Sequence, residues 1–229
     1  LSELFCFAGE WERADKQLDA IGHQDPQSIV GLSLMRQLIR AEVSRSECWS
    51  EGRPPEVLFE PEGSIKLHLE ALAEWRSGEE SRAAELCEEA EASRTKVTGV
   101  CDGQSFEGLR DLDDLCAGFF EVLTSTGKYY WTPIDRVRSV EFEPAKRPQD
   151  VLWRRATMEV ADGPCGEVFL PSVYPATRGE SDDRLSLSRV TDWVGGEGPL
   201  TRGVGQRMFL VGDEPAPILQ IETLEIAVD

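Results

Sequence analysis

The stretch KYYWTPIDRVRSVEFEP, residues 128–144, marks the point where the character of this sequence changes. It contains two short runs of aromatic and β-branched residues, which are typical of β-strands, with proline and aspartate between them. No segment between the runs that follow is long enough for a crossover helix, which disfavours a parallel sheet. A small, mainly antiparallel β-sheet or barrel is therefore predicted for residues 126–229. The further runs are DVLWRRATMEV at 150–160, GEVFLPSVYP at 166–175, QRMFLVG at 206–212 and ILQIETLEIAV at 218–228.

A glycine-rich stretch, GVGQRMFLVGD at 203–213, raises the question of a phosphate-binding turn. A P-loop ends in lysine followed by serine or threonine, and a dinucleotide-binding turn has a third glycine where Met208 stands here. We interpret the glycines as a bend or bulge that precedes a strand. Met208 or Phe209 is then expected to be buried, and Arg207 to face solvent or a partner. The segment VGDEPAPI is predicted to join this strand to the last one as a hairpin.

The sequence before residue 126 has the periodicity of amphipathic helices. In the first of them, Trp11, Ala14, Leu18 and Ile21 form one apolar face. Asp25-Pro26 is expected to end this helix, and the prolines of segment 50–63 exclude a continuous helix there. Further helices are predicted at residues 28–45, 65–77, 79–92 and 105–123.

Two of the helical segments are similar to each other. LFCFAGEWERADKQL and LAEWRSGEESRAAEL align Gly9 with Gly78 and Ala14 with Ala83, an offset of 69 residues. This is close to twice the tetratricopeptide period of about 34 residues. The pattern predicts a degenerate array of tetratricopeptide-like hairpins over residues 1–125, and ordinary helical hairpins remain the alternative. The expected fold class is α+β, with a helical domain at 1–125 and a small β domain at 126–229.

Composition limits the classes of function. The 229 residues are 40% hydrophobic, and their formal net charge is −19, with 25 acidic against 12 basic residues in 1–120. This charge argues against nucleic acid and anionic membrane surfaces as partners, and it favours a basic partner segment. No run approaches the length of about 18 apolar residues that a transmembrane helix needs. The six cysteines lack the paired spacing of a zinc site and are interpreted as reduced, structural residues of a cytoplasmic protein.

Candidate catalytic or metal-binding residues are few. Asp111, Asp113 and Asp114 could hold a cation, but no histidine or glutamate follows at a ligand spacing, which favours a solvated or capping acidic face. The two histidines, His23 and His68, lack a serine or cysteine in a recognisable nucleophile motif. We therefore predict neither catalytic residues nor a metal or cofactor.

Basic and aromatic side chains suggest a surface for a protein partner. Six basic residues occur close together in an acidic chain, and aromatic residues lie just before them. Alternatively, the basic residues occupy polar positions on half-exposed strands, and the aromatic residues are buried in the β core. The basic residues are Arg136, Arg138, Lys146, Arg147, Arg154 and Arg155. The candidate partner-binding residues are Tyr129, Tyr130, Trp131, Arg154, Arg155 and Arg207.

Long blocks of the sequence resemble the ImpE family, also called TagJ, of type VI secretion accessory proteins. The resemblance rests on residues 9–20, 106–114, 127–144, 150–175 and 189–213. It implies a tetratricopeptide-like N-terminal part, a small β C-terminal part and a cytoplasmic role near the contractile sheath. It also implies binding of the small sheath subunit, TssB, and a link to the ClpV disassembly ATPase.

The leading hypothesis is thus a non-enzymatic adaptor whose helical hairpins receive an amphipathic helix or an extended tail of a partner. Two alternatives belong to other classes. One is a metal-dependent hydrolase that uses Asp111, Asp113 and Asp114 with His68. The other is a regulatory module whose aromatic residues 129–131 line a small-ligand pocket.

Overall fold

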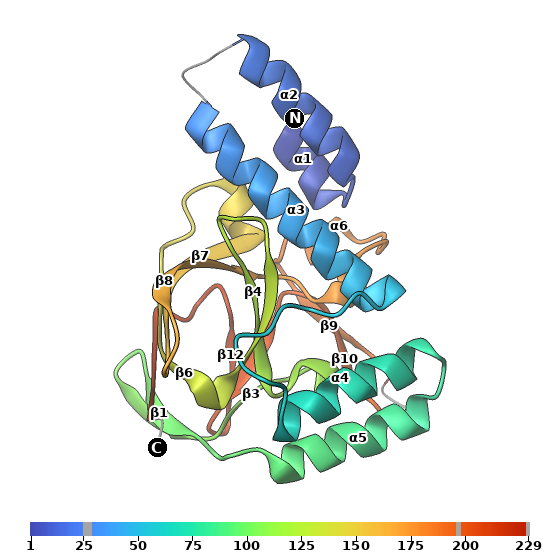
Figure 1. The fold of residues 1–229 in the computed structure, drawn as a ribbon, viewed down its shortest axis with the longest axis vertical. Coiled ribbons are helices and arrows are strands. Elements are labelled where there is room, and N and C mark those ends of the chain that lie inside the picture. Colours follow the sequence, from blue (N-terminus) through green and yellow to red (C-terminus); the bar gives the residue numbers. More distant parts are fainter. Residues whose placement is uncertain (25–28, 196–197, 228–229) are drawn as a thin grey trace.

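The computed structural model describes residues 1–24, 29–195 and 198–227 of the chain. It is an α+β protein, as predicted, in which helices from the N-terminal part pack around β-sheets (Figure 1). The predicted end of the first helix at Asp25-Pro26 lies outside the described residues. The helices are α1 (Ser2–Phe7), α2 (Trp11–Gln24), α3 (Ile29–Glu51), α4 (Gly63–Arg76), α5 (Glu80–Ser93) and the short α6 (Asp183–Ser186).

Glycines and alanines shape the helical part in the way the sequence indicates. Gly9, with a φ of 68°, ends α1, and Gly78, with a φ of 88°, separates α4 from α5; only glycine adopts such angles without strain. Ala14 and Ala83 are fully buried between helices. The α2/α3 pair and the α4/α5 pair lie at opposite ends of the molecule, however (Figure 1). Helical hairpins are therefore present, but their tetratricopeptide-like stacking is not confirmed.

As predicted, the proline-rich segment 50–63 contains no continuous helix, since α3 ends at Glu51 and α4 begins at Gly63. It crosses the edge of a sheet, where the Glu56 amide donates to the carbonyl of Tyr129 at 2.9 Å. The Trp131 amide in turn donates to the Glu56 carbonyl at 3.1 Å. Since an uncovered edge strand exposes unpaired backbone groups, this segment protects one edge of the sheet.

The described residues form three antiparallel sheets, so the sheet structure is larger than predicted. The main sheet has eight strands in the order β2-β1-β13-β6-β7-β8-β4-β5, and two smaller sheets have the orders β12-β11-β3 and β10-β9. The first five strands in the chain are β1 (Thr98–Cys101), β2 (Gln104–Glu107), β3 (Leu109–Asp111), β4 (Phe119–Leu123) and β5 (Tyr129–Pro133). The next four are β6 (Val137–Phe142), β7 (Trp153–Val160), β8 (Cys165–Pro171) and β9 (Thr191–Val194). The last four are β10 (Arg202–Gly205), β11 (Met208–Val211), β12 (Glu214–Pro217) and β13 (Thr223–Ala227).

The helix predicted at residues 105–123 is wrong. This segment forms β2, β3 and β4, with a 3₁₀ helix, η2 (Asp114–Cys116), before β4. Gly108 has a φ of 91°, which breaks any helix at this point. The apparent helical face arose because both faces of β4 are buried, so its residues Phe119 and Phe120 are apolar without alternation. β-structure therefore begins near residue 98, well before residue 126.

The glycine-rich stretch leads into a strand, as predicted, although its hairpin differs from the predicted one. Gly205, with a φ of 86°, makes the bend between β10 and β11, and Phe209 is fully buried. The turn at Gly212 joins β11 to β12, and β12 lies in the segment VGDEPAPI, which was predicted to be a loop. The last strand, β13, pairs instead with β1 and β6 in the main sheet.

Side chains on the two faces of the main sheet enter two different cores. Phe119, Leu123 and Trp131 pack with helical residues such as Leu38 and Leu72. Phe120 and Val122, which alternate with them along β4, pack on the other face with Phe209 and Leu224. The helices therefore cover one face of the sheet. Glu121 alternates with Phe120 and Val122 along β4, so its side chain points to the face of the sheet that the helices cover.

Candidate functional site

Glu121 is a carboxylate buried beneath α3. The Arg45 guanidinium of α3 donates to both of its oxygens at 2.9 Å, and Trp49 Nε1 donates to one of them at 2.9 Å. The Arg207 guanidinium and the Tyr129 hydroxyl also donate to it. Burial alone would raise the pKa of Glu121, but the two guanidiniums outweigh that effect and lower it to about 2. The carboxylate is therefore ionised and fully occupied at neutral pH.

The same network continues from Glu121 toward the small sheets. Arg207, on the loop before β11, also contacts Asp111 at 3.1 Å, and the Tyr174 hydroxyl lies 2.9 Å from an Asp111 oxygen. Burial raises the pKa of the Tyr174 hydroxyl beyond its ordinary range, so the phenol keeps its proton. Asp113 accepts from Arg202 Nε at 2.9 Å and from the Gly203 amide at 3.0 Å. These bonds tie β3, β4 and β10 together through charged groups rather than through apolar packing.

A second branch of the network joins α3 to segment 152–174. Arg45 donates to Glu42 at 2.8 Å and to the carbonyl of Val173 at 2.9 Å. Trp153 Nε1 donates to the other Glu42 oxygen at 3.0 Å. All these groups except the Val173 carbonyl belong to buried side chains. The helix is thus fixed to two separate parts of the chain by one arginine.

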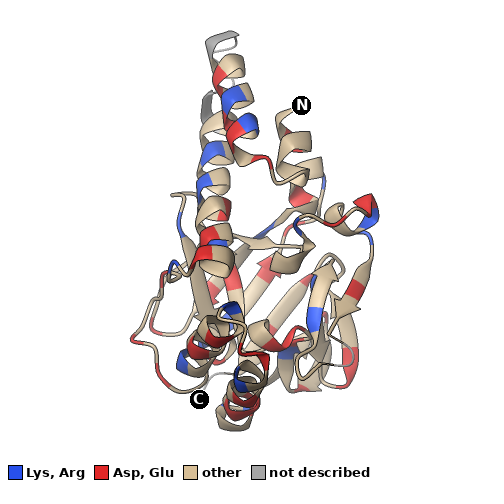
Figure 2. Cartoon of the chain, turned by 90° about the vertical axis from the view of Figure 1, so that its right-hand side faces the viewer, with Lys and Arg blue, Asp and Glu red and all other residues tan. Residues whose placement is uncertain are grey.

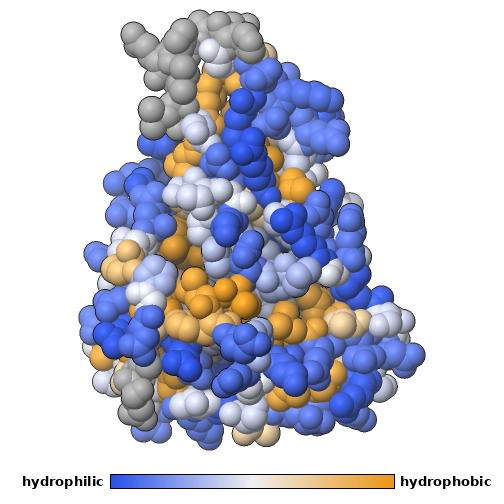
Figure 3. Space-filling model, viewed as in Figure 1, coloured by the Kyte–Doolittle hydropathy of each residue, from blue (hydrophilic) through white to orange (hydrophobic). Residues whose placement is uncertain are grey.

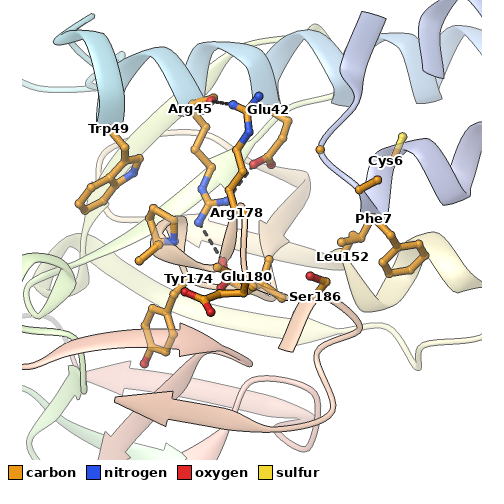
Figure 4. A pocket seen from close by; sticks show the side chains of 18 of the residues that line it. Cys6, Phe7, Glu42, Arg45, Trp49, Leu152, Tyr174, Arg178, Glu180 and Ser186 are labelled. Carbon is orange, nitrogen blue, oxygen red and sulfur yellow. Dashed lines mark hydrogen bonds and ion pairs between the residues drawn. The ribbon is translucent and has the colours of Figure 1, made fainter. Parts of the chain in front are cut away.

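A pocket of about 900 Å³ opens beside this network. Its wall is formed by α1, the second half of α3, the end of α4 and the segment 173–187 (Figure 4). The Arg178 guanidinium donates to Ser46 Oγ of α3 and so links two sides of the pocket. Glu42 and Arg45 belong both to the pocket wall and to the buried network, which holds that wall in place.

Four of the six predicted partner-binding residues are buried rather than exposed. Tyr129 and Trp131 face α3, and Trp131 Nε1 donates to the Tyr129 hydroxyl at 2.5 Å. Arg207, expected at the surface, is only 2% exposed, because two carboxylates hold it inside. Arg154 is buried as well and donates to the carbonyls of Glu143, Ile218 and Ile221. For these four residues the predicted surface position is wrong.

The two remaining candidates reach solvent. Tyr130 is half-buried on the opposite face of β5, and Arg155 is exposed and paired with Glu167. Their role in partner binding stays a prediction. Tyr129, Tyr130 and Trp131 do not belong to the wall of the large pocket, which removes the basis of the small-ligand hypothesis for residues 129–131.

The three aspartates of the hydrolase hypothesis are held by protein groups. Asp111 and Asp113 contact Arg207 and Arg202, and Asp114 pairs with Arg110 at 2.7 Å. Within residues 1–24, 29–195 and 198–227, no group of three His, Cys, Asp or Glu side chains converges as a metal site. Asp111 and Asp113 are fully buried, so a solvated acidic face is wrong for them, but the predicted capping role is confirmed for Asp113, which accepts from the Leu115 amide at the start of η2. Nothing in this arrangement supports a metal-dependent hydrolase.

His68 lies in α4, with its ring 5.6 Å from that of Phe119. Neither imidazole nitrogen has a hydrogen-bond partner in the part of the chain that the structure describes. Burial lowers the pKa of His68 from 6.5 to about 4. The histidine is therefore a neutral core residue at physiological pH. The backbone of His23 lies within α2, which continues to Gln24.

His68 should make the protein sensitive to mild acid. Between pH 6.5 and 4 the unfolded state binds a proton that the folded state excludes, so the free energy of unfolding falls as the pH falls, by about 3 kcal/mol in total. Substituting His68→Leu removes this proton. Urea unfolding at several pH values measures the free energy of unfolding of both proteins. Below pH 6.5 we expect this free energy to fall less for the variant than for wild type. Parallel stability curves would contradict the buried neutral state.

All six cysteines are free, and four of them are buried: Cys6, Cys48, Cys87 and Cys116. Burial raises the pKa of the Cys48 and Cys87 thiols to about 12, so these thiols stay protonated. The predicted structural, buried position is confirmed for these four cysteines, whereas Cys165 is exposed. No helix among the described residues is long and apolar enough to cross a bilayer.

The most informative residues of the site were missed by sequence reasoning. Arg45 and Glu121 lie 76 positions apart, and no local pattern pairs them. One signal was available, because Glu121 interrupts the apolar run FFEVL and a charge within a buried strand requires a partner. Arg202 and Glu42 carried no comparable signal.

Comparison with known proteins identifies the class to which this α+β protein belongs. Residues 103–225, more than half of the chain, match the family model described as ImpE protein. The chain therefore belongs to the ImpE family of type VI secretion accessory components, as its sequence blocks indicated.

Two relatives extend the similarity to the helical part. The type VI secretion system accessory component TagJ of Pseudomonas aeruginosa is 28% identical over 225 residues, which cover 98% of this chain and 78% of the relative. The crystal structure of protein VPA1032 from Vibrio parahaemolyticus has a TM-score of 0.91 and 26% identity. That alignment covers 100% of this chain and 85% of the other.

Proposed function

We propose that this protein is a non-enzymatic, cytoplasmic adaptor of a type VI secretion system. In this role it binds the small subunit of the contractile sheath and links it to the ClpV-type disassembly ATPase. The observation that carries the proposal is membership of the ImpE family, together with the similarity to TagJ over nearly the whole chain. The buried carboxylates support a binding role over a catalytic one, because arginines and backbone amides already occupy them.

The surface chemistry supports a partner segment with basic residues. Acidic side chains are spread over the helices and the loops, with fewer basic ones among them (Figure 2). Apolar surface is broken into separate patches between hydrophilic areas (Figure 3). Such a surface attracts a basic partner over long range and leaves apolar side chains to make specific local contacts. The helical domain would supply the groove, and the β domain would hold the helices in place.

The proposal predicts a direct complex between this protein and the small sheath subunit of the same genome. The two purified proteins, mixed at micromolar concentration, should form a complex in isothermal titration calorimetry. Because the chain carries a charge of −19, the affinity should fall as the salt concentration rises. Lack of a complex at micromolar concentration and modest salt would overturn the sheath-binding role. The same titration with the ClpV-type ATPase tests the second link.

A further inference from the structure

Arg202, at the start of β10, has a guanidinium group that is only partly hydrogen-bonded. The residue is 5% exposed, and its Nε donates to both oxygens of Asp113 at 2.9 Å. Its Nη1 and Nη2 atoms have no hydrogen-bond partner among the described residues. A buried charged donor without an acceptor is costly, so such groups call for an explanation. The two Nη groups of Arg202 can therefore donate hydrogen bonds to a further anionic group.

Aromatic rings hold this guanidinium in one orientation. Its central carbon lies 4.5 Å from the ring centre of Trp75 and 5.4 Å from that of Trp49. Stacking on aromatic faces leaves the edge of a guanidinium available for a bidentate acceptor such as a carboxylate. Trp75 is only half-buried, and rotation of its ring would open a path to this edge.

Arg202, Trp49 and Trp75 all belong to the wall of the 900 Å³ pocket. Arg76, which follows Trp75 on the same wall, is exposed and makes no ion pair with any described residue. The carboxylate of Glu42 nearby is already paired with Arg45. Arg202 is offset by Asp113, so Arg76 is the residue that adds a positive charge, unpaired among the described residues, to this end of the pocket in an otherwise strongly acidic chain.

The opposite side of the pocket is apolar. Figure 4 shows Cys6, Phe7 and Leu152 across the pocket from Trp49. Leu4, also on the wall, is 65% exposed and adds to the apolar surface on this side. The pocket thus combines apolar contacts on one side with anion-binding groups on the other.

We propose that this pocket binds a peptide segment in which an acidic side chain stands next to apolar ones, and that Arg202 holds its carboxylate. A bidentate carboxylate matches the two free Nη groups. A polyanion such as a nucleic acid fits less well, because the net charge of −19 repels many phosphates far more strongly than a single carboxylate. The inference rests on the proposed function, since it assumes that the partner is a protein.

The test uses the peptide acetyl-Leu-Glu-Leu-amide as a probe and the whole protein labelled with ¹⁵N. Adding the peptide should shift the indole N–H signals of Trp49 and Trp75 in a saturable way, each signal being assigned through a Trp→Phe variant. The peptide acetyl-Leu-Gln-Leu-amide should bind at least tenfold more weakly. Absence of saturable shifts, equal binding of the glutamine peptide or the same shifts with inorganic phosphate would each overturn the proposal.

Variants of the protein test whether Arg202 is the residue that binds the glutamate carboxylate of the peptide. Arg202→Lys keeps a cation beside Asp113 but loses the forked edge, and we expect at least a tenfold weaker affinity for the glutamate peptide. Arg76→Gln, at the surface, should weaken it severalfold even if the lysine variant folds poorly. Arg138→Lys, on β6 and outside the pocket, is the matched control and should leave the affinity unchanged. Unchanged affinity in both pocket variants would refute the role of this site.

Binding of the sheath subunit to wild type and to Arg202→Lys distinguishes failure of this inference from failure of the proposed function. If the sheath subunit binds wild type and Arg202→Lys equally well, the carboxylate site is wrong and the adaptor function stands. If the peptide binds in an Arg202-dependent way but the sheath subunit does not bind, the pocket is correct and the partner is a different protein.

Discussion

Replacing Glu121 with alanine is expected to lower the free energy of unfolding by about 3–5 kcal/mol, because it removes the carboxylate that two buried guanidiniums share and leaves their positive charge only partly compensated. Both Arg45 and Arg207 depend on this carboxylate, and they are 3% and 2% exposed. Trp49 and Tyr129 lose an acceptor in the same step. The loss is therefore larger than that of a single hydrogen bond. Urea unfolding followed by tryptophan fluorescence measures it.

Glu167→Ala is the matched control for this experiment. Glu167 also pairs with an arginine, Arg155, but both side chains reach solvent, and exposed pairs contribute about 0–1 kcal/mol. A loss of less than about 1 kcal/mol at both positions would contradict the central role of Glu121. The amide variant Glu121→Gln keeps the size of the side chain and serves if the alanine variant does not fold. It should still be less stable than wild type, because an amide does not neutralise two guanidiniums.

The network also connects stability with the proposed binding role. Arg45 reaches Glu121 in the sheet, Glu42 on its own helix and the Val173 carbonyl, so it fixes two walls of the pocket relative to the sheet. A wall that is rigid before binding lowers the entropic cost of binding, because its own side chains need not be ordered when the ligand arrives. Charged groups in the core restrict the position of α3 more tightly than apolar contacts would, since an ion pair has a defined geometry. Loss of Glu121 should thus weaken peptide binding even in the fraction that remains folded.

Local sequence patterns correctly predicted the elements whose apolar periodicity and end residues lie within a short stretch of the chain. The α2 helix shows its apolar face at Ala14 and Leu18, and Gly9 and Gly78 mark the turns between helices. Segment 105–123 was misread because β4 is buried on both sides, and a strand of that kind has the same apolar density as a buried helix. Gly108 within this segment was the available warning.

The site could be predicted only in part, because its contacts join distant positions. Arg207 was identified as an important arginine, but its burial depends on Asp111 and Glu121, which lie 96 and 86 positions earlier in the chain. A surface role is the ordinary expectation for an arginine whose partners are unknown. The same holds for Arg202, since its two tryptophan neighbours come from α3 and α4. Family membership, by contrast, was readable from the sequence blocks alone.

The aromatic run at residues 129–131 shows how alternation along one strand separates structural from surface residues. Trp131 is fully buried, its ring stacks on that of Phe119 at 3.9 Å, and it lies 5.9 Å from that of Trp49. Trp131→Ala should therefore cost about 3–5 kcal/mol in unfolding free energy, since it opens a large cavity between α3 and β4. Thermal and urea unfolding monitored by circular dichroism measure this loss.

The neighbouring residue provides the control for this second large effect. Tyr130 lies on the other face of β5 and is half-buried, so Tyr130→Ala should cost markedly less than Trp131→Ala. Trp131→Phe should fall between them, because a phenyl ring keeps the stacking on Phe119 but loses the indole hydrogen bond to Tyr129. Equal losses at positions 130 and 131 would mean that β5 does not present alternate residues to the two cores. The reverse order would place Tyr130, rather than Trp131, against α3.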